Sequence, residues 1–518
     1  MLSSKDYRLF LKLSCLLGYL FVSNGGLYET IAIQIGHNSP AKMLFYSAYS
    51  FVFAALFIYF SFYTRGIWKL VAFLPFLASG ISGQHYWIIT GHPITIDAIE
   101  MALINTKGAA GFVNETFDYM LFALATASIG ILGIALPVAS TPFQNILDKP
   151  IFRRLSLGLA VIMFLGTSAV VLLRNGYGMT GMPVQVSSLF PLPVTQFSSN
   201  FTREDRFIFQ HEGSNSIVVV IDESVSYRHM KKVARLIESE TFPALANAGQ
   251  IMPIIKTAEP FHALHNCSAQ SVWGIINGLR IQNGNIILGP SLWELSKKAG
   301  YKTVYISAQE SPSQHQYMQT PNDLAHMDER YYFGDLTRTE RDRGALGQVL
   351  TSLNGGEKVF IFVVKNGSHF PYEWQIPSDD MTRYLIPDGI NLKERAYLTS
   401  IYRNTFRFLG DLLTNSAAVA PMIFYTSDHG QNLLTSGFAH CNSADPQADE
   451  WEVPLLTHNV PSNVTGPMAS NTQLHSSIAR AMGYDAPYAA EGDSHDVMLY
   501  GSVNTRIRSQ INDFKSGR

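Results

Sequence analysis

The stretch SIVVVIDES, residues 216–224, is a continuous apolar run that ends in acidic residues. A short run without alternation is typical of a strand that is buried on both faces of a parallel sheet. Three similar runs follow it: KTVYIS (302–307), KVFIFVV (358–364) and APMIFYTSD (420–428). Segments of helical pattern separate the runs, among them 291–300, 344–354 and 396–415. We therefore predict an α/β domain with a largely parallel central sheet.

Side chains suited to metal binding follow several of these runs. Glu223 follows the first run and His369 the third, while Asp428 and His429 end the fourth, with His440 a little further on. In such sheets, ligands bind beyond the carboxyl ends of the strands, so we expect these side chains to converge. Carboxylate oxygens and imidazole nitrogens are common zinc ligands. The pattern favours a zinc site over histidines that lie in surface turns by chance.

A candidate nucleophile lies between the first two runs. In HNCSAQSV, residues 265–272, Ser268 opens a segment of helical appearance. A hydroxyl at the start of a helix can attack a phosphoryl or sulfuryl group, because the helix dipole and the free N–H groups favour the anion. A metal would lower the pKa of that hydroxyl. The alternative is that Ser268 only caps the helix, and the local sequence leaves both interpretations open.

The first third of the chain holds long apolar stretches, each close to the roughly 20 residues that a membrane-spanning helix needs. We predict five spans: Arg8–Ile35, Lys42–Tyr63, Trp68–Thr90, Asp118–Ser140 and Leu155–Leu173. Any one of them could be a buried helix of a soluble protein, but five in succession argue against that. The first is not a cleavable signal peptide, because it is too long and no A-x-A-like site ends it.

Lysine and arginine predict the orientation of these helices, because they accumulate in cytoplasmic loops. On one side lie Lys5, Arg8, Lys12, Arg65, Lys69, Lys149, Arg153 and Arg154. The other side has only the single charges Lys42, Lys107 and Arg174. The N-terminus is therefore predicted to be cytoplasmic. An odd number of crossings then places the chain after Arg174 outside the inner membrane, in the periplasm.

The length and composition of the chain are consistent with a membrane part followed by a globular part. The chain has 518 residues, and only 15% are charged while 47% are apolar. We predict five transmembrane helices in 1–174, a linker in 175–210 and a periplasmic catalytic domain in 211–518. The stretch 91–117 is either a plain loop or a segment that lies on the membrane surface near a lipid substrate. A net charge of −2 and the lack of a basic stripe argue against nucleic-acid binding.

The chain resembles the phosphoethanolamine transferases that modify lipid A and related surface glycans, which belong to the sulfatase and alkaline phosphatase superfamily. Five motifs in order carry the resemblance. VVIDES (219–224) is similar to the family's VVGET, HNCSAQSV (265–272) to TSTAYSV and GSHFP (367–371) to GSHGP. YTSDHGQNLLTSG (425–437) is similar to YxSDHGESLGE, and WEVPLL (451–456) resembles an SVP-type strand.

The resemblance implies a site and a reaction. Zn²⁺ would be held by Glu223, Ser268, Asp428 and His429, and the catalytic residues would be Ser268, His369 and His440. Ser268 would take phosphoethanolamine from phosphatidylethanolamine and pass it to a cell-envelope glycan or lipid. The implied protein is a transferase of the bacterial inner membrane, and we expect a monomer in contact with membrane lipids.

Departures from the family pattern indicate a divergent member. Ser268 replaces a threonine, Asp222 replaces the glycine before Glu223, and Gln431 replaces a glutamate. Alternatives of the same fold are a phosphoglycerol transferase or a sulfate or phosphate ester hydrolase, although the C/S-x-P-x-R segment of sulfatases is missing around Ser268. A catalytically inactive membrane scaffold is the alternative from another class, but every matched position holds a competent residue.

Two of the three cysteines adjoin the predicted site, Cys267 beside Ser268 and Cys441 beside His440. If their neighbours converge on one metal, the two sulfurs lie within several to about 15 Å of each other, which permits a disulfide without requiring it. Two separate, partly buried thiols are slightly favoured. The family's several disulfides cannot all form with two periplasmic cysteines.

Overall fold

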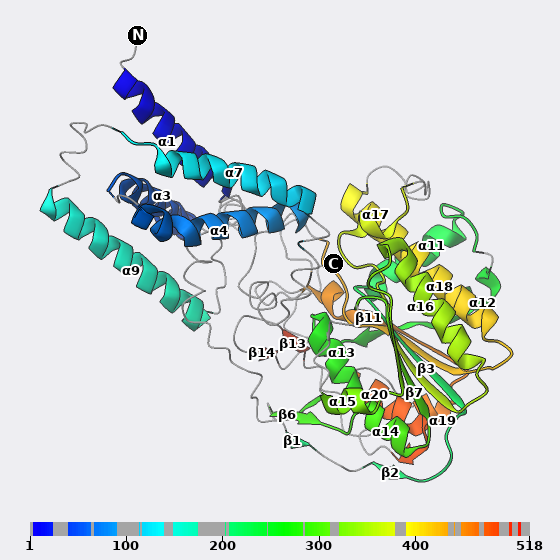
Figure 1. Ribbon diagram of the computed structural model, residues 1–518. Helices are drawn as coiled ribbons and strands as arrows, with labels where there is room; N and C mark the ends of the chain where they lie inside the picture. The colour runs from blue at the N-terminus through cyan, green and yellow to red at the C-terminus, as the bar shows by residue number, and fades with distance from the viewer. Residues whose placement is uncertain are drawn as a thin grey trace. The chain divides into compact units, whose positions relative to one another are not determined.

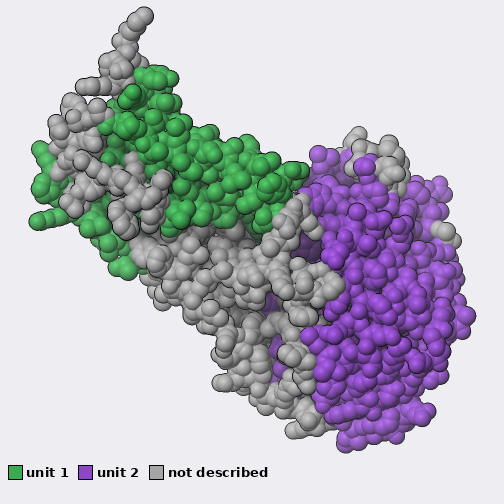
Figure 2. Space-filling view, viewed as in Figure 1, with its two compact units in different colours: residues 1–196, 502–504 green, residues 197–501, 505–518 purple. Residues whose placement is uncertain are grey.

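The structure is a computed structural model that describes residues 4–23, 40–63, 67–90, 113, 117–138, 149–174, 202–203, 207–245, 247–282, 285–310, 321–378, 390–433, 440, 447–465, 471–485, 497–499 and 506–508. The chain divides into two compact units, Met1–Gln196 with Ser502–Asn504, and Phe197–Gly501 with Thr505–Arg518 (Figure 2). The division falls within the predicted linker, 175–210. At its end, however, β1 (Thr202–Arg203) and β2 (Ile208–Phe209) already pair with β6 (Asn285–Leu288) and β12 (Tyr484–Asp485) of the second unit.

In the first unit, a described helix overlaps each predicted span (Figure 1). The helices are α1 (Ser4–Ser23), α3 (Pro40–Tyr63), α4 (Ile67–Thr90), α7 (Phe117–Ala135) and α9 (Pro150–Arg174). Among the residues that the structure describes, α7 is the one helix whose length and apolar composition suffice to cross a membrane. The five-span bundle therefore stays a prediction. Residues 91–112 and 114–116, which include most of the predicted surface segment, lie outside the described residues.

A buried lysine joins the first helix to the end of α7. The Nζ atom of Lys12 donates to the carbonyl oxygens of Gly133, Ile134 and Leu136 at 2.8, 3.2 and 3.1 Å. The last carbonyl groups of a helix lack partners within the helix and carry the negative end of its dipole, so an ammonium group stabilises them. The contact stabilises the end of α7, which lies at Ala135, short of the predicted Ser140.

The second unit is built on a seven-stranded mixed sheet in the order β4-β11-β10-β3-β9-β7-β8. The strands are β3 (Ser216–Asp222), β4 (Glu259–His262), β7 (Lys302–Ser307), β8 (Glu329–Tyr332), β9 (Val359–Val364), β10 (Met422–Ser427) and β11 (Glu452–His458). The five strands from β10 to β8 are parallel, and β11 and β4 add an antiparallel edge. The predicted largely parallel sheet is therefore confirmed for its central strands.

Helices cover both faces of this sheet (Figure 1). One face is covered by α11 (Tyr227–Glu238), α12 (Ala248–Thr257), α16 (Arg338–Leu353), α17 (Leu392–Ser400) and α18 (Arg407–Asn415). The other is covered by α13 (Ser268–Ile276), α14 (Leu292–Lys298) and α20 (Asn471–Ala481). Successive side chains of β3 enter the two cores in turn, Val218 on one side and Val219 on the other. This explains why the strand is apolar at every position.

Shorter elements complete the second unit. They are β5 (Arg280–Gln282), β13 (Val497–Leu499), β14 (Arg506–Arg508), α15 (Pro321–Ala325), α19 (Ser462–Thr465) and the 3₁₀ turns Tyr372–Gln375 and Ala448–Glu450. A π-helical segment, Ile401–Phe406, joins α17 to α18 within the stretch predicted to be one helix.

Candidate metal centre and active site

Three buried side chains at the carboxyl end of the sheet form a candidate metal centre. Glu223 directly follows β3, and Asp428 and His429 directly follow the neighbouring parallel strand β10. The two strands stay in register up to the pair Asp222 and Ser427, so the next residues of both strands emerge side by side. One potential ligand atom from each of the three side chains lies within 4.8 Å of the others.

The geometry of His429 leaves one ring nitrogen available to the centre. Its Nδ1 atom lies 2.7 Å from the carbonyl oxygen of Gly430, which can only accept, so Nδ1 carries the proton. The lone pair of Nε2 then faces the carboxylates, 3.5 Å from Oε1 of Glu223 and 3.6 Å from Oδ2 of Asp428. A backbone carbonyl that fixes the tautomer in this way is the usual arrangement for a histidine that binds a metal.

The two carboxyl groups disfavour each other's negative charge. Burial tends to raise the pKa of Glu223, but nearby His369 and His429 and hydrogen bonds from its neighbours hold that pKa at about 2. Burial and the charge of Glu223 together raise the pKa of Asp428 well above its ordinary value. Among the described residues, Oδ2 of Asp428 has no hydrogen-bond partner although it is buried. A cation between the three side chains would satisfy this oxygen and relieve the repulsion, so the residues fit a metal ion.

Ser268 lies at the centre, at the first residue of α13. Its Oγ atom is 3.0 Å from Nε2 of His429 and 3.4 Å from Oε1 of Glu223. The nearby Ser271 is buried, and its hydroxyl donates to the carbonyl oxygen of Asp428. Of these two hydroxyl groups, the one that contacts the candidate metal ligands is Ser268, whereas Ser271 supports the backbone behind them.

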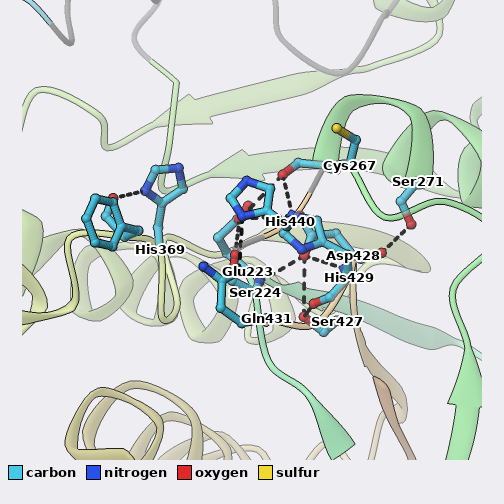
Figure 3. Close-up of polar contacts among 12 residues, drawn as sticks. Glu223, Ser224, Cys267, Ser271, His369, Ser427, Asp428, His429, Gln431 and His440 are labelled. Carbon is cyan, nitrogen blue, oxygen red and sulfur yellow. Dashed lines mark hydrogen bonds and ion pairs between the residues drawn. The ribbon is translucent and has the colours of Figure 1, made fainter. Parts of the chain in front are cut away.

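Two further histidines lie near the centre, His440 beside His429 and His369 further to one side (Figure 3). The ring of His440 stacks on that of His429 with a centroid distance of 4.4 Å, and its Nδ1 atom lies 3.0 Å from Oε1 of Gln431. The Nδ1 atom of His369 contacts the carbonyl oxygen of Phe370. Burial lowers the pKa of His369 and lowers that of His440 well below its ordinary value. Burial thus disfavours the charged form of both rings.

Cys267, which precedes Ser268 and occupies the N-cap position of α13, is disulfide-bonded. The preference for a free thiol at this position is therefore wrong. Cys15 is the free cysteine of the described residues, and Cys441 lies outside them, so the alternative of a Cys267–Cys441 pair is not described. The bond restrains the backbone directly beside the candidate nucleophile.

Asp222, the residue that departs from the family pattern, does not face the metal centre. Its Oδ2 atom accepts from Nζ of Lys365 at 2.6 Å and from the hydroxyls of Thr405 and Tyr425 at 2.8 Å each. Its Oδ1 atom accepts from the backbone N–H of Glu223 at 3.0 Å. A buried ion pair thus occupies the space beneath the strand end, and Asp222 anchors Glu223 without being a ligand itself.

The π-helical segment Ile401–Phe406 supplies partners to this ion pair. The carbonyl oxygen of Asn404 accepts from Nζ of Lys365 at 2.8 Å, and its side-chain amide donates to the carbonyl oxygen of Gly367 at 2.7 Å. A π turn changes the regular hydrogen-bond ladder of a helix, and such turns are frequent near functional sites. Here the segment turns Asn404 and Thr405 toward the residues behind the metal centre.

Sequence reasoning missed two glutamines in the site. Gln309 follows β7, and its Nε2 atom donates to Oε2 of Glu223 at 2.8 Å. Gln431 links His440 to Tyr372, whose hydroxyl lies 2.6 Å from Nε2 of Gln431. Both follow apolar runs, the same signal that identified Glu223 and Asp428. An amide is not a typical zinc ligand, so the pattern of zinc-binding residue types does not single them out.

Comparison with known proteins gives structural neighbours only. No protein-family model and no curated protein sequence matches the chain. The integral membrane lipooligosaccharide phosphoethanolamine transferase A (EptA) from Neisseria meningitidis matches with a TM-score of 0.57 at 12% identity, over 92% of this chain and 96% of that one. This match shows that the chain shares the fold of that protein over most of its length.

Other neighbours cover a smaller share of this chain. The periplasmic domain of EptC from Escherichia coli in complex with Zn has a TM-score of 0.46 at 17% identity, over 59% of this chain and 95% of that one. An alkaline phosphatase superfamily protein from Vibrio parahaemolyticus has a TM-score of 0.36 at 11% identity, over 54% and 68%. The neighbours are thus phosphoethanolamine transferases and alkaline phosphatase superfamily members at low sequence identity.

Proposed function

We propose that the chain is a metal-dependent transferase that moves phosphoethanolamine from phosphatidylethanolamine to a glycan or lipid of the cell envelope through a phospho-Ser268 intermediate. The observation that carries the proposal is the position of the Ser268 hydroxyl, at the N-terminus of α13 and 3.0 Å from Nε2 of His429. It joins a nucleophile, a helix terminus that favours anions and a buried set of metal ligands in one place.

Zn²⁺ is the proposed metal, because oxygen and nitrogen donors in a small buried site suit it. Glu223, Asp428 and His429 would hold the ion, and Ser268 would complete the set. When bound, the metal would lower the pKa of the Ser268 hydroxyl and neutralise charge on the phosphoryl group. One EptC neighbour was solved as a zinc complex, which agrees with this proposal without carrying it.

In the first half-reaction, Oγ of Ser268 attacks phosphorus. A Ser268–phosphorus bond forms, and the bond from phosphorus to the glycerol oxygen breaks. The proton that the Ser268 hydroxyl gives up passes to the glycerol oxygen, so that diacylglycerol leaves as an alcohol. The free N–H groups at the start of α13 stabilise the phosphoryl oxygens. In the second half-reaction, an acceptor oxygen attacks the same phosphorus, the Ser268–phosphorus bond breaks, and the proton that the acceptor loses returns to Ser268.

His369 and His440 are proposed to bind the phosphoryl oxygens and to move protons. Their Nδ1 atoms contact Phe370 and Gln431, which leaves their Nε2 atoms for substrate. A neutral ring with a free Nε2 atom suits removal of a proton from an acceptor hydroxyl. Donation to the leaving glycerol oxygen requires that the ring first gains a proton, which a bound phosphate anion favours.

The membrane unit has a physical role in this proposal. A lipid donor reaches the second unit only if that unit is held near the outer surface of the inner membrane, and the helices before residue 175 would hold it there. We propose that they span the membrane, that residues 175–210 form the connection and that the domain from 211 onward is periplasmic. The EptA neighbour is itself described as an integral membrane protein.

The rivals that the sequence leaves open are a phosphoglycerol transferase, an ester hydrolase and an inactive scaffold. Incubating the purified protein with headgroup-labelled phosphatidylethanolamine or phosphatidylglycerol, followed by thin-layer chromatography, separates them. We expect diacylglycerol from phosphatidylethanolamine and, when an envelope lipid extract supplies the acceptor, a labelled acceptor. Turnover of phosphatidylglycerol alone, release of the headgroup to water alone, or no turnover of either lipid would each contradict the proposal.

A further inference from the structure

Gln309 connects three neighbouring strand ends at the candidate metal centre. It lies just after β7, which is separated from β3 in the sheet by β9. Its Nε2 atom donates to Oε2 of Glu223, after β3, at 2.8 Å and to the carbonyl oxygen of Lys365, after β9, at 2.7 Å. Adjacent strands lie about 4.8 Å apart, so this side chain reaches across roughly two strand spacings.

These two bonds use both hydrogens of the side-chain amide, so the position of Nε2 is set from two directions. Lys365, which accepts one of these bonds, is itself held in place. Its Nζ atom donates to Asp222 at 2.6 Å and to the carbonyl oxygen of Asn404 at 2.8 Å. The backbone of Gln309 is restrained as well, since its N–H donates to Oγ of Ser307 at 3.3 Å.

As a result, the two carboxylate oxygens of Glu223 have different partners. Oε2 receives the amide of Gln309 at 2.8 Å, whereas Oε1 faces Oγ of Ser224 at 2.7 Å and Oγ of Ser268 at 3.4 Å. Oε1 is also the atom that lies 3.5 Å from Nε2 of His429. The amide thus holds the carboxylate with Oε1 directed toward the nucleophile and the other candidate ligands.

We infer that Gln309 is a positioning residue that orients Glu223 for metal binding. This inference rests on the proposed function only in taking Glu223 as a metal ligand. Residues that hydrogen-bond to metal ligands raise affinity by fixing their orientation, and their loss commonly costs about 10–100-fold. A glutamine meets two needs here: it spans the distance from β7 to Glu223, and it offers two N–H donors to two acceptors. A glutamate of the same shape offers neither donor and places a second carboxylate against Glu223.

The test measures zinc affinity of the purified full-length protein by competition with a chromophoric chelator. We expect Gln309→Leu to bind zinc about 10–100-fold more weakly than the wild type. Gln309→Glu, which keeps the shape, should also be weakened, and added zinc should restore part of the transferase activity of both variants. The matched control is Gln348→Leu, which removes a half-buried glutamine that donates to Ser352 on α16 and should leave zinc affinity unchanged.

The outcomes are distinguishable. Zinc affinity of both Gln309 variants within about twofold of the wild type, with the metal-free proteins unfolding at the same temperature as the wild type, would overturn the inference. If Gln309→Leu does not fold, the result for the isosteric Gln309→Glu decides. A wild type that binds no zinc overturns the inference as well. A wild type that binds zinc tightly and loses it in the variants, but transfers no headgroup, supports the role of Gln309 and contradicts the proposed function.

Discussion

Two buried carboxylates lie beside each other at the candidate metal centre, and this is unfavourable unless a cation joins them. Glu223 keeps its charge, with a pKa of about 2, and the pKa of Asp428 rises well above its ordinary value through burial and the charge of Glu223. Burial also lowers the pKa of His429, which disfavours a positive charge on its ring. A divalent ion would supply positive charge without this cost, so metal removal should affect both the site and the stability of the second unit.

This arrangement predicts different metal contents for two groups of variants. Glu223→Ala, Asp428→Ala and His429→Ala should each lose bound zinc, because each removes one ligand from the centre. His369→Ala and His440→Ala should keep most of the zinc and lose rate, because these rings lie outside the ligand set. Elemental analysis of the purified proteins gives the answer. Full zinc occupancy in all three variants of the first group would refute the assignment of ligands.

The ligand-type residues could be predicted from sequence because each follows an apolar run, and parallel strands end at one edge. Glu223 and Asp428 needed no knowledge of strand order. The role of Gln309 could not be predicted, because it depends on β9 lying between β7 and β3, an order that no local pattern contains. The same holds for Asp222, whose partner Lys365 follows a different strand.

Among the elements, the helix from α17 to α18 shows how a local irregularity serves a distant site. Its π-helical segment presents Asn404 and Thr405 to the buried pair of Lys365 and Asp222. The sequence indicated a single helix over this stretch, and its apolar pattern gave no sign of the irregularity. The pair in turn holds the residue before Glu223, so the segment contributes to the shape of the metal centre.

Removing the lysine of this pair should be costly. Lys365→Met leaves the carboxylate of Asp222 buried without its counter-ion, and breaking a buried pair in this way typically costs about 3–5 kcal/mol. The control is Lys298→Met, since Lys298 forms an exposed pair with Glu294 on α14 that is worth about 0.3–0.5 kcal/mol. Urea unfolding of both variants measures the difference. A loss of stability no larger than that of the control would show that the pair is not needed.

At the scale of the whole molecule, the division into two units was predictable from the uneven distribution of apolar residues. The exact boundary was not, because β1 and β2 are too short to show a strand pattern and gain their partners, β6 and β12, from distant parts of the chain. The helices of the first unit lie where the apolar stretches are. Their crossing of a membrane remains a prediction, since among the described residues one helix, α7, is long and apolar enough to span a membrane.

The predicted topology has a direct test. A reporter that is active only in the periplasm should work when it is fused after Arg174, because lysine and arginine cluster in the loops assigned to the cytoplasm. The same reporter should be inactive when it is fused near Arg65 or Arg153. The reverse pattern would place the second unit in the cytoplasm, away from any envelope acceptor.

The central claim is that Ser268 carries the transferred group, and mass spectrometry of the protein after incubation with phosphatidylethanolamine tests it most directly. The wild type should carry a phosphoethanolamine adduct on the peptide that contains Ser268, and Ser268→Ala should carry none. Ser271→Ala removes a hydrogen bond to the carbonyl oxygen of Asp428 and leaves the Ser268 hydroxyl in place, so it should still form the adduct. An adduct on another residue, or transfer by Ser268→Ala at the wild-type rate, would contradict the account.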